Sequence, residues 1–205
     1  ITCFKIKVEG EDDLDRIAAI RSALGAEVTL RVDANARWSL SEARLFAAAV
    51  QRFDIDYLED PVGSLEELES LRSDGIVRVA ADMLVRNAAD AQRAQTLGAA
   101  DVLVVKVQPL GGLFEAFQIA ESFEGDVVVS SMMESSVGIQ VGLALACALT
   151  REPLACGLGT GSLLQSDVVA ASLVPSGGLL AWPSAPMELI TNSSTNMANA
   201  NGCSI

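Results

Sequence analysis

The sequence has 205 residues, half of them hydrophobic, which is enough to bury one substantial core. Its formal net charge of −13 disfavours binding to nucleic acid or to anionic membrane surfaces. The absence of histidine excludes a Ser-His-Asp triad, a zinc site built on histidine and a histidine general base. No signal-peptide pattern opens the sequence and the four cysteines show no CxxC spacing. We therefore expect a cytoplasmic location, with Cys3, Cys147 and Cys156, which lie in apolar runs, as reduced core thiols.

Short β-branched runs alternate with helical stretches rich in Ala and Leu along the chain. Strands are predicted at 3–8, 28–32, 55–58, 77–80, 102–107, 127–131 and, more weakly, 156–159. Ser39 and Ser64 are the expected N-caps of helices, and Gly25 and Gly98 are expected to end helices. Strands that alternate with helices predict a parallel sheet with right-handed crossovers.

A polar residue or a glycine follows at the end of each predicted strand, at intervals of 23 to 26 residues: Lys7, Asp33, Glu59, Asp82, Lys106, Ser131 and Gly157. This interval is typical of one strand–helix unit in a (β/α)8 TIM barrel, which uses about 250 residues for eight units. An open doubly wound sheet is the alternative, but it does not explain why every strand ends in a functional type of group. Because only seven strands are predicted, we expect the first barrel strand to precede Ile1.

Three carboxylates and a lysine carry the prediction of a site. In a TIM barrel the C-terminal ends of the strands converge, so Asp33, Glu59 and Asp82 are expected to share one small volume. Taken alone, Asp33 fits a turn or helix cap as well as it fits a functional site. Glu59 fits an ordinary loop acid before Pro61 as well as it fits a functional site. Together, three neighbouring carboxylates need a cation between them, and oxygen ligands without His or Cys favour Mg²⁺. Lys106 lies within a run of valines, where a lysine is rarely buried without a function.

Lysines flank the carboxylates in the sequence, with Lys7 before them and Lys106 after them. A nearby metal and partial burial lower the pKa of a lysine, which then serves as a base near neutral pH. A metal that binds a substrate carboxylate beside such a lysine promotes removal of the proton α to that carboxylate. This arrangement is one that enolase-superfamily enzymes are known to use.

The segments FKIKV, RVDAN, YLEDP, ADM and VVKVQPLGG resemble the successive strand-end motifs of the enolase superfamily, in its muconate-lactonising subgroup. The resemblance spans about residues 2–189 and implies a (β/α)7β portion of the barrel, with an N-terminal capping domain and the first strand expected outside the sequence. It implies one Mg²⁺ as cofactor, with Mn²⁺ able to substitute. The implied roles are acid/base for Lys7, the opposite face of the substrate for Lys106, metal binding for Asp33, Glu59 and Asp82, and substrate contact for Lys5 and Asn35.

Two later segments resemble o-succinylbenzoate synthases within that subgroup. They are SSMMESSVG at 130–138 and CGLGTGSLLQSDV at 156–168, and the Asp-x-Asp motif of dipeptide epimerases is absent. The resemblance implies Mg²⁺-dependent dehydration of 2-succinyl-6-hydroxy-2,4-cyclohexadiene-1-carboxylate to o-succinylbenzoate in menaquinone synthesis, with Ser131, Gly157 and Gly159 near a substrate carboxylate. N-succinylamino acid racemisation and an inactive fragment or binding scaffold are the alternatives. A phosphate loop at GLGTG is disfavoured because no Walker lysine follows it.

Residues 1–190 are expected to form the partial catalytic barrel, and the Asn- and Ser-rich stretch 191–205 a disordered or non-native polar tail. The expected partner is a small carboxylate substrate, and the sequence does not define the oligomeric state. A barrel without one strand has two unpaired edges, so we expect the isolated chain to be unstable or to aggregate unless another segment closes it.

Overall fold

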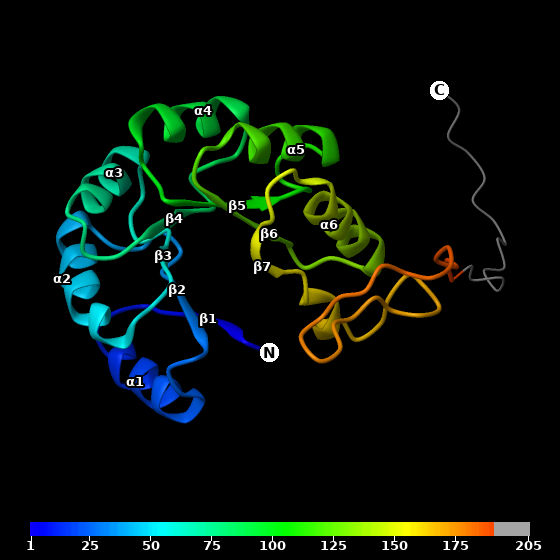
Figure 1. Ribbon diagram of the computed structural model, residues 1–205, viewed down its shortest axis with the longest axis horizontal. Helices are drawn as coiled ribbons and strands as arrows, with labels where there is room; N and C mark the ends of the chain where they lie inside the picture. The colour runs from blue at the N-terminus through cyan, green and yellow to red at the C-terminus, as the bar shows by residue number, and fades with distance from the viewer. Residues whose placement is uncertain (191–205) are drawn as a thin grey trace, which may run out of the picture.

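The computed structural model describes residues 1–190 and is built around one parallel sheet (Figure 1). Its seven strands are β1 (Cys3–Lys7), β2 (Thr29–Asp33), β3 (Leu58–Glu59), β4 (Val79–Ala81), β5 (Val102–Lys106), β6 (Asp126–Ser130) and β7 (Leu154–Gly157). Each strand pairs in parallel with the next along the chain. This order excludes the doubly wound alternative, in which the strand order reverses at a switch point.

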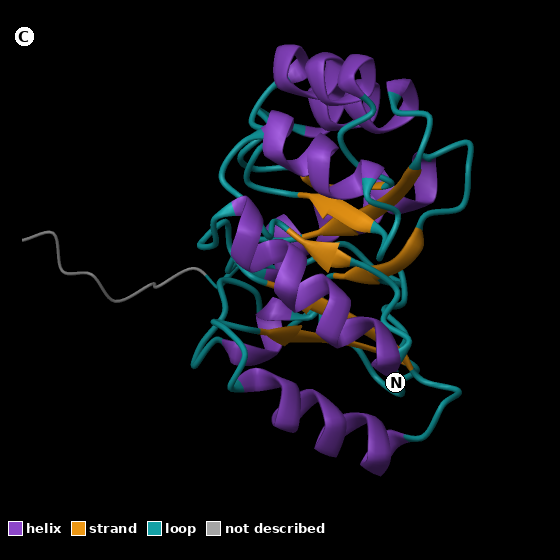
Figure 2. Ribbon diagram, turned by 90° about the vertical axis from the view of Figure 1, so that its left-hand side faces the viewer, coloured by secondary structure: helices purple, strands orange, loops and turns teal. Residues whose placement is uncertain are grey.

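Six helices cover the outer face of the curved sheet (Figures 1 and 2). They are α1 (Asp13–Leu24), α2 (Leu40–Val50), α3 (Leu65–Ser73), α4 (Ala88–Leu97), α5 (Leu113–Ser122) and α6 (Ser136–Ala148), and short 3-10 turns lie at η1 (Gln51–Phe53) and η2 (Thr160–Leu163). The sheet curls into a nearly closed ring, with β1 and β7 on the two sides of the opening (Figure 1). The predicted TIM-barrel architecture with seven strands is therefore confirmed.

Local sequence signals define the helix ends as predicted. Ser39 caps α2 through a capping box, in which its hydroxyl accepts from the Glu42 N–H and the Glu42 carboxylate accepts from the Ser39 N–H. Ser64 caps α3 in the same way through its hydroxyl. Gly98 ends α4 at a φ of +63°, a left-handed conformation that glycine adopts without the steric cost of a side chain.

Three predicted strands are displaced in the structure. The strand expected at 55–58 pairs only at Leu58–Glu59, the one expected at 77–80 begins at Val79, and the one expected at 156–159 begins earlier, at Leu154. The left-handed φ of Asp54 shows that the chain is still turning out of η1 just before residue 55.

The prediction of core thiols is wrong for Cys147 and Cys156, which are exposed. Cys156 lies on the last strand of the described sheet, which is paired on one side only.

Alternation along each strand separates two apolar regions. The larger lies between the sheet and the helices and includes Leu30, Val32 and Leu103, all fully buried. The smaller region consists of Tyr57, Ala80, Val102, Val104 and Val128. These residues lie two or four positions before the polar residue that ends or directly follows their strand, so their side chains are on the same face of the sheet as that residue. Because this second group fills the interior of the ring, the polar side chains that follow it along the strands are carried to one end of the barrel.

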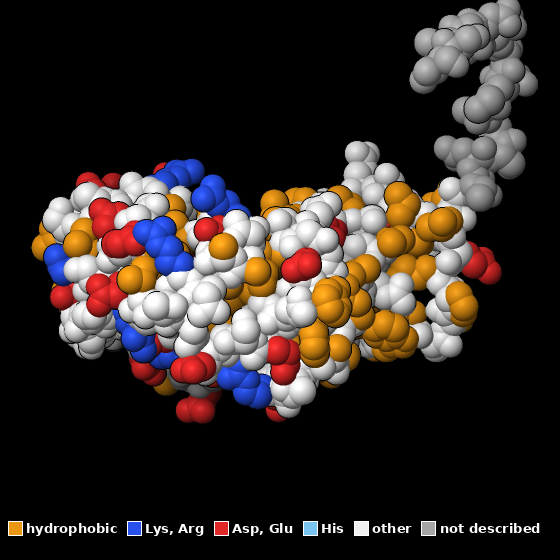
Figure 3. Space-filling view, turned by 90° about the horizontal axis from the view of Figure 1, so that it is seen from above, with side chains coloured by type: hydrophobic (Ala, Val, Ile, Leu, Met, Phe, Trp, Pro, Cys, Tyr) orange, Lys and Arg blue, Asp and Glu red, His pale blue; other side chains and the backbone are white. Residues whose placement is uncertain are grey.

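The surface shows the same division between polar and apolar parts. Charged side chains are spread over the half that carries α1 to α4, and hydrophobic side chains gather at the end near α6 and the C-terminal segment (Figure 3). Leu163, Leu179 and Trp182 are among the exposed hydrophobic side chains of this C-terminal part, with more than half of each surface accessible. None of the helices formed by residues 1–190 has the length and hydropathy needed to cross a bilayer.

Candidate active site

The register of the sheet aligns the predicted site residues in two rows, since the row of Glu59 continues to Ala80 and Val102 and not to Lys106. Lys7 is paired with Asp33, and Asp33 with Glu59, across the first three strands. On the other side Lys106 is paired with Ser130, and Ser130 with Gly157. Paired residues of neighbouring strands lie about 5 Å apart, so these side chains form a short arc at the mouth of the barrel.

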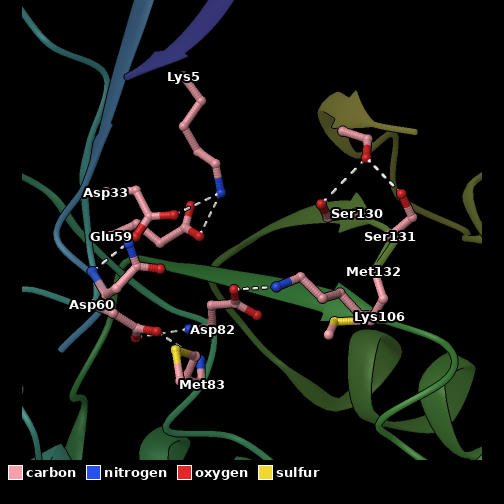
Figure 4. A network of polar contacts seen from close by, with 12 residues as sticks. Lys5, Asp33, Glu59, Asp60, Asp82, Met83, Lys106, Ser130, Ser131 and Met132 are labelled. Atoms are coloured by element: carbon pink, nitrogen blue, oxygen red, sulfur yellow. Dashed lines mark hydrogen bonds and ion pairs between the residues drawn. The ribbon is translucent and has the colours of Figure 1, made fainter. Parts of the chain in front are cut away.

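Lys5 and Lys7 bind the carboxylates at the ends of β2 and β3. The Lys5 ammonium lies 2.7 Å from Glu59 Oε1 and 3.0 Å from Asp33 Oδ2 (Figure 4). The Lys7 ammonium donates to the same Asp33 oxygen at 2.5 Å and to Asn35 Oδ1 at 2.8 Å. Asn35 in turn donates its N–H to Asp33 Oδ1 at 3.0 Å. The two lysines therefore lie on one face of β1, as their spacing in the sequence predicts.

Asp82 and Lys106 form the second charged group of the mouth. Their side chains make an ion pair and are largely buried, with exposed fractions of 11% and 16%. Lys106 approaches Asp82 from one side of the mouth, and Lys5 approaches Glu59 and Asp33 from the other (Figure 4). The sequence contains three lysines in all, and every one of them bonds a predicted metal-ligand carboxylate.

Burial and neighbouring charge separate the two carboxylates that Lys5 contacts. Burial raises the pKa of Glu59 to about 8, and the Asp33 charge adds to this while Lys5 opposes it. Burial acts in the same direction on Asp33, but Lys5 and Lys7 outweigh it and hold the pKa of Asp33 at about 2. The pKa of Lys5 is raised, since the attraction of Glu59 and Asp33 exceeds the effect of its burial.

The donor set fits a divalent cation, although within residues 1–190 no three acidic or cysteine side chains stand close enough to form a ready ligand cluster. Lysine ammonium groups, at Lys5, Lys7 and Lys106, bond the three carboxylates instead. Glu59 Oε2 is buried and has no hydrogen-bond partner, and a buried carboxyl oxygen of this kind is stabilised by a proton or by a bound cation. Carboxylate oxygens are ligands that Mg²⁺ and Mn²⁺ prefer.

The last two strands contribute hydroxyl groups and backbone to the mouth. The hydroxyls of Ser130 and Ser131 both donate to the Gly157 carbonyl at 3.3 Å, and Ser131 also lies 2.9 Å from Thr160 Oγ1. A Cβ on Gly157 would approach Ser130 Oγ to 2.8 Å, so glycine permits this close contact between β6 and β7. Gly159 lies in the exposed loop that follows. The structure thus brings Ser131 and Gly157 together, with their hydrogen bonds made to each other.

The sequence analysis missed Asp60 and the methionines at the mouth. Asp60 is 1% exposed, and burial raises its pKa to about 6. Met83 and Met132 lie beside Asp82 and Ser131, with about half of each side chain exposed (Figure 4). An acid directly after Glu59 in YLEDP was the only signal for Asp60, and it resembles an ordinary loop residue.

A parallel barrel with carboxylates on successive strand ends and lysines on both sides of them is the architecture of the enolase superfamily. The chain belongs to this group, since the family described as Enolase C-terminal domain-like matches residues 1–186. Enzymes of the superfamily generally depend on a divalent metal.

Individual relatives narrow the comparison. The chain is 43% identical over 169 residues to an o-succinylbenzoate synthase of Thermobifida fusca (strain YX). The aligned region is 82% of the chain and 53% of that protein. A muconate cycloisomerase from Pseudomonas fluorescens is similar in structure, with a TM-score of 0.85, 26% identity and coverage of 92% and 55%. A dipeptide epimerase from Enterococcus faecalis V583, complexed with Mg and L-Leu-L-Tyr, gives a TM-score of 0.78, 30% identity and coverage of 84% and 51%. The chain spans about half the length of these proteins.

Proposed function

We propose that this chain is the catalytic barrel of an o-succinylbenzoate synthase. The reaction is the dehydration of 2-succinyl-6-hydroxy-2,4-cyclohexadiene-1-carboxylate to o-succinylbenzoate. The observation that supports it most directly is the pair of lysines, Lys7 on β1 and Lys106 on β5, on the two sides of Asp33, Glu59 and Asp82. Relatives 42% to 43% identical over most of the chain are named for this activity.

Lys7 is placed to move the proton in both halves of the reaction. In its neutral form its Nζ takes the proton from the ring carbon that carries the carboxylate. The resulting ammonium then protonates the hydroxyl that departs from the neighbouring carbon, so one water leaves and the base is restored. Lys7 is more than half exposed and bonds Asn35 and Asp33, which hold its amino group at the rim of the mouth.

Lys106 acts from the other face as a fixed positive charge. Its largely buried side chain is held by Asp82, so its ammonium lies in a site of low dielectric where charge is screened little by water. Such a charge stabilises the negative charge that develops on the substrate carboxylate after proton removal. Lys5 adds a second positive charge beside Asp33 and Glu59.

Asp33, Glu59 and Asp82 are proposed to hold one Mg²⁺, or Mn²⁺ in its place. When bound, the cation supplies Lewis-acid stabilisation of the substrate carboxylate. Glu59 offers an oxygen without a hydrogen-bond partner, and Asp33 stays ionised at any physiological pH because its pKa lies at about 2.

N-succinylamino acid racemisation is the second candidate. It requires a base on each face of the substrate, and the positions of Lys7 and Lys106 on opposite sides of the carboxylates satisfy this requirement. The two activities require different chemistry of Lys106. In the racemase Lys106 must take up and release a proton, whereas in the synthase it need only carry a positive charge. Lys106→Arg separates them, because arginine keeps the charge and does not deprotonate.

The test is a turnover assay with the cyclohexadiene carboxylate and Mg²⁺, following loss of the diene absorbance. A capping domain and first strand from a relative are joined to the chain, so that the mouth is enclosed. We expect Lys7→Ala to lower kcat by about 10²- to 10⁴-fold, the usual contribution of general acid–base catalysis. Lys106→Ala is expected to lower kcat by about 10²- to 10³-fold through loss of a stabilising charge, and a chelator to abolish turnover. Arg93→Ala, which alters only an exposed ion pair with Glu66, is the control. A folded, metal-loaded protein without turnover would exclude the synthase.

A further inference from the structure

Asp60 is buried beside the proposed metal ligands, and its side chain bonds the backbone at the end of the next strand. It follows Glu59 directly and is 1% exposed. Its two carboxylate oxygens accept the N–H groups of two consecutive residues on the next strand end, Asp82 at 3.0 Å and Met83 at 2.7 Å (Figure 4). Carboxylates that accept two backbone N–H groups make strong, charge-assisted bonds, which fix the geometry of the backbone they contact.

These bonds take the place of β3–β4 hydrogen bonds, because the pairing of these strands stops before Asp82. The pairing of β3 with β4 comprises only Leu58 with Val79 and Glu59 with Ala80. Asp82 lies one residue beyond the end of β4, where no strand partner holds its N–H. The Asp60 side chain takes the place of that partner, so the position from which the Asp82 carboxylate extends depends on Asp60.

The backbone of Asp60 is itself held on both sides. Its N–H donates to the Ala80 carbonyl at 2.9 Å, and its carbonyl accepts from the Ala36 N–H at 2.6 Å. Its φ is +39°, a left-handed conformation that costs a non-glycine residue about 1 kcal/mol or more. The following residue, Pro61, also favours an extended conformation at this position. Strain of this kind persists when surrounding bonds over-determine it, and here those bonds join the ends of β2, β3 and β4.

We propose that Asp60 is a positioning residue that sets the location of the Asp82 carboxylate and thereby the affinity of the mouth for a divalent cation. This inference rests on the proposed metal-binding role of Asp82. Asp60 touches neither substrate nor cation, and it acts through the two N–H bonds. The ion pair between Asp82 and Lys106 extends the effect to the lysine on the far side of the mouth.

The chain provides a matched control on the same strand. Asp101 accepts the Val79 N–H at 2.9 Å and so caps the opposite end of β4, away from the mouth. In both cases replacement by Asn keeps the shape but turns an acceptor into an NH₂ donor that faces a backbone N–H. We expect Asp60→Asn to weaken Mn²⁺ binding by about 10- to 100-fold, as mutations of partners that orient metal ligands do. Asp101→Asn is expected to leave Mn²⁺ affinity unchanged.

Mn²⁺ affinity is measured by electron paramagnetic resonance of the free ion, with folding checked by circular dichroism and any sequence preceding Ile1 in the natural protein included. Asp82→Asn is run alongside. Loss of Mn²⁺ binding in Asp82→Asn but not in Asp60→Asn overturns the positioning role and leaves the proposed function intact. Unchanged binding in Asp82→Asn overturns the metal site itself, and with it the proposed function.

A measurement on the unmodified protein covers the case in which Asp60→Asn does not fold. The amides of Asp82 and Met83 are expected to exchange with solvent at least about 100-fold more slowly than unstructured amides, because both are bonded to a buried carboxylate. Exchange of these two amides at the rate of an unstructured loop would overturn the inference without any variant.

Discussion

Replacement of Arg31 by methionine tests the ion pairs that hold the barrel together below the site. Arg31 is 5% exposed, donates to Asp56 Oδ2 at 2.9 Å and to the Ala155 carbonyl at 2.6 Å, and lies 4.9 Å above the Tyr57 ring. It therefore joins β2 to β7 across the open side of the ring. Methionine preserves the length and apolar contact of the side chain and removes every one of these polar interactions.

The expected loss follows from these contacts. A hydrogen bond to a charged group contributes about 1.5 to 3 kcal/mol, and a desolvated cation–π contact about 2 kcal/mol. Asp56 retains a second partner, because Arg78 donates to its other oxygen at 3.1 Å, so no isolated buried charge remains. The Ala155 carbonyl loses the donor that Arg31 provides. We therefore expect Arg31→Met to lower the free energy of unfolding by about 3 kcal/mol.

Urea denaturation followed by circular dichroism gives this free energy, and Arg72→Met is the matched control. Arg72 also bonds one carboxylate and one carbonyl, Asp101 Oδ1 at 2.7 Å and Gly98 O at 3.0 Å, but it is 42% exposed. Exposed pairs contribute about 1 kcal/mol or less. If the two substitutions cost the same, burial does not strengthen the Arg31 contacts and the reasoning fails.

Three further outcomes are expected. The affinity for Mn²⁺ should rise with pH up to about 8 and then level off, because the proton on Glu59 competes with the cation below its raised pKa; a profile flat from pH 6 to 9 would contradict this. Ser39→Ala should lower the free energy of unfolding by about 1 kcal/mol in urea denaturation and leave turnover unchanged, and a smaller effect than that of Ser41→Ala would show that the capping box contributes nothing. Gly157→Ala should reduce kcat/KM by up to about 10²-fold in the dehydration assay, because its Cβ displaces the Ser130 hydroxyl, and unchanged kinetics would show that this contact is not needed.

The architecture was predictable because two local signals agree along the whole chain. Hydrophobic periodicity identifies each strand and helix, and caps such as Ser39, Ser64 and Gly98 define where helices begin and end. The regular interval between strand-end residues then selects a barrel over an open sheet. The strand limits were less predictable, since the length of β3 depends on which residues its neighbours pair with, and that is decided by tertiary contacts.

The charged residues of the candidate site were predictable from position and type. Lys7, Asp33, Glu59 and Lys106 each end a strand. The register of the sheet brings Lys7, Asp33 and Glu59 into one row and pairs Lys106 with Ser130 in a second. Their individual roles stay predictions. The tail expected at 191–205 lies outside the described residues.

Asp60 shows what the sequence could not reveal. Its function depends on the direction of two N–H groups that are 22 and 23 residues further along the chain. No periodicity or spacing encodes that contact, since it arises only where β4 ends and the backbone of Asp82 leaves the ladder. The exposure of Cys147 was equally hidden, because an apolar run in α6 does not state which side of the helix meets the sheet.

The two ends of the barrel use different cations for a physical reason. Below the site, Arg31 and Arg78 each bond a different oxygen of Asp56, and arginine stays charged at any accessible pH. At the mouth all cationic contacts to the three carboxylates come from lysines, and within residues 1–190 no arginine bonds Asp33, Glu59 or Asp82. Lysine holds a single point of charge that can lose its proton and move aside for another cation. Arginine ion pairs thus hold the end below the site, and the mouth, where the proposed function requires proton transfer and cation binding, is held by lysines.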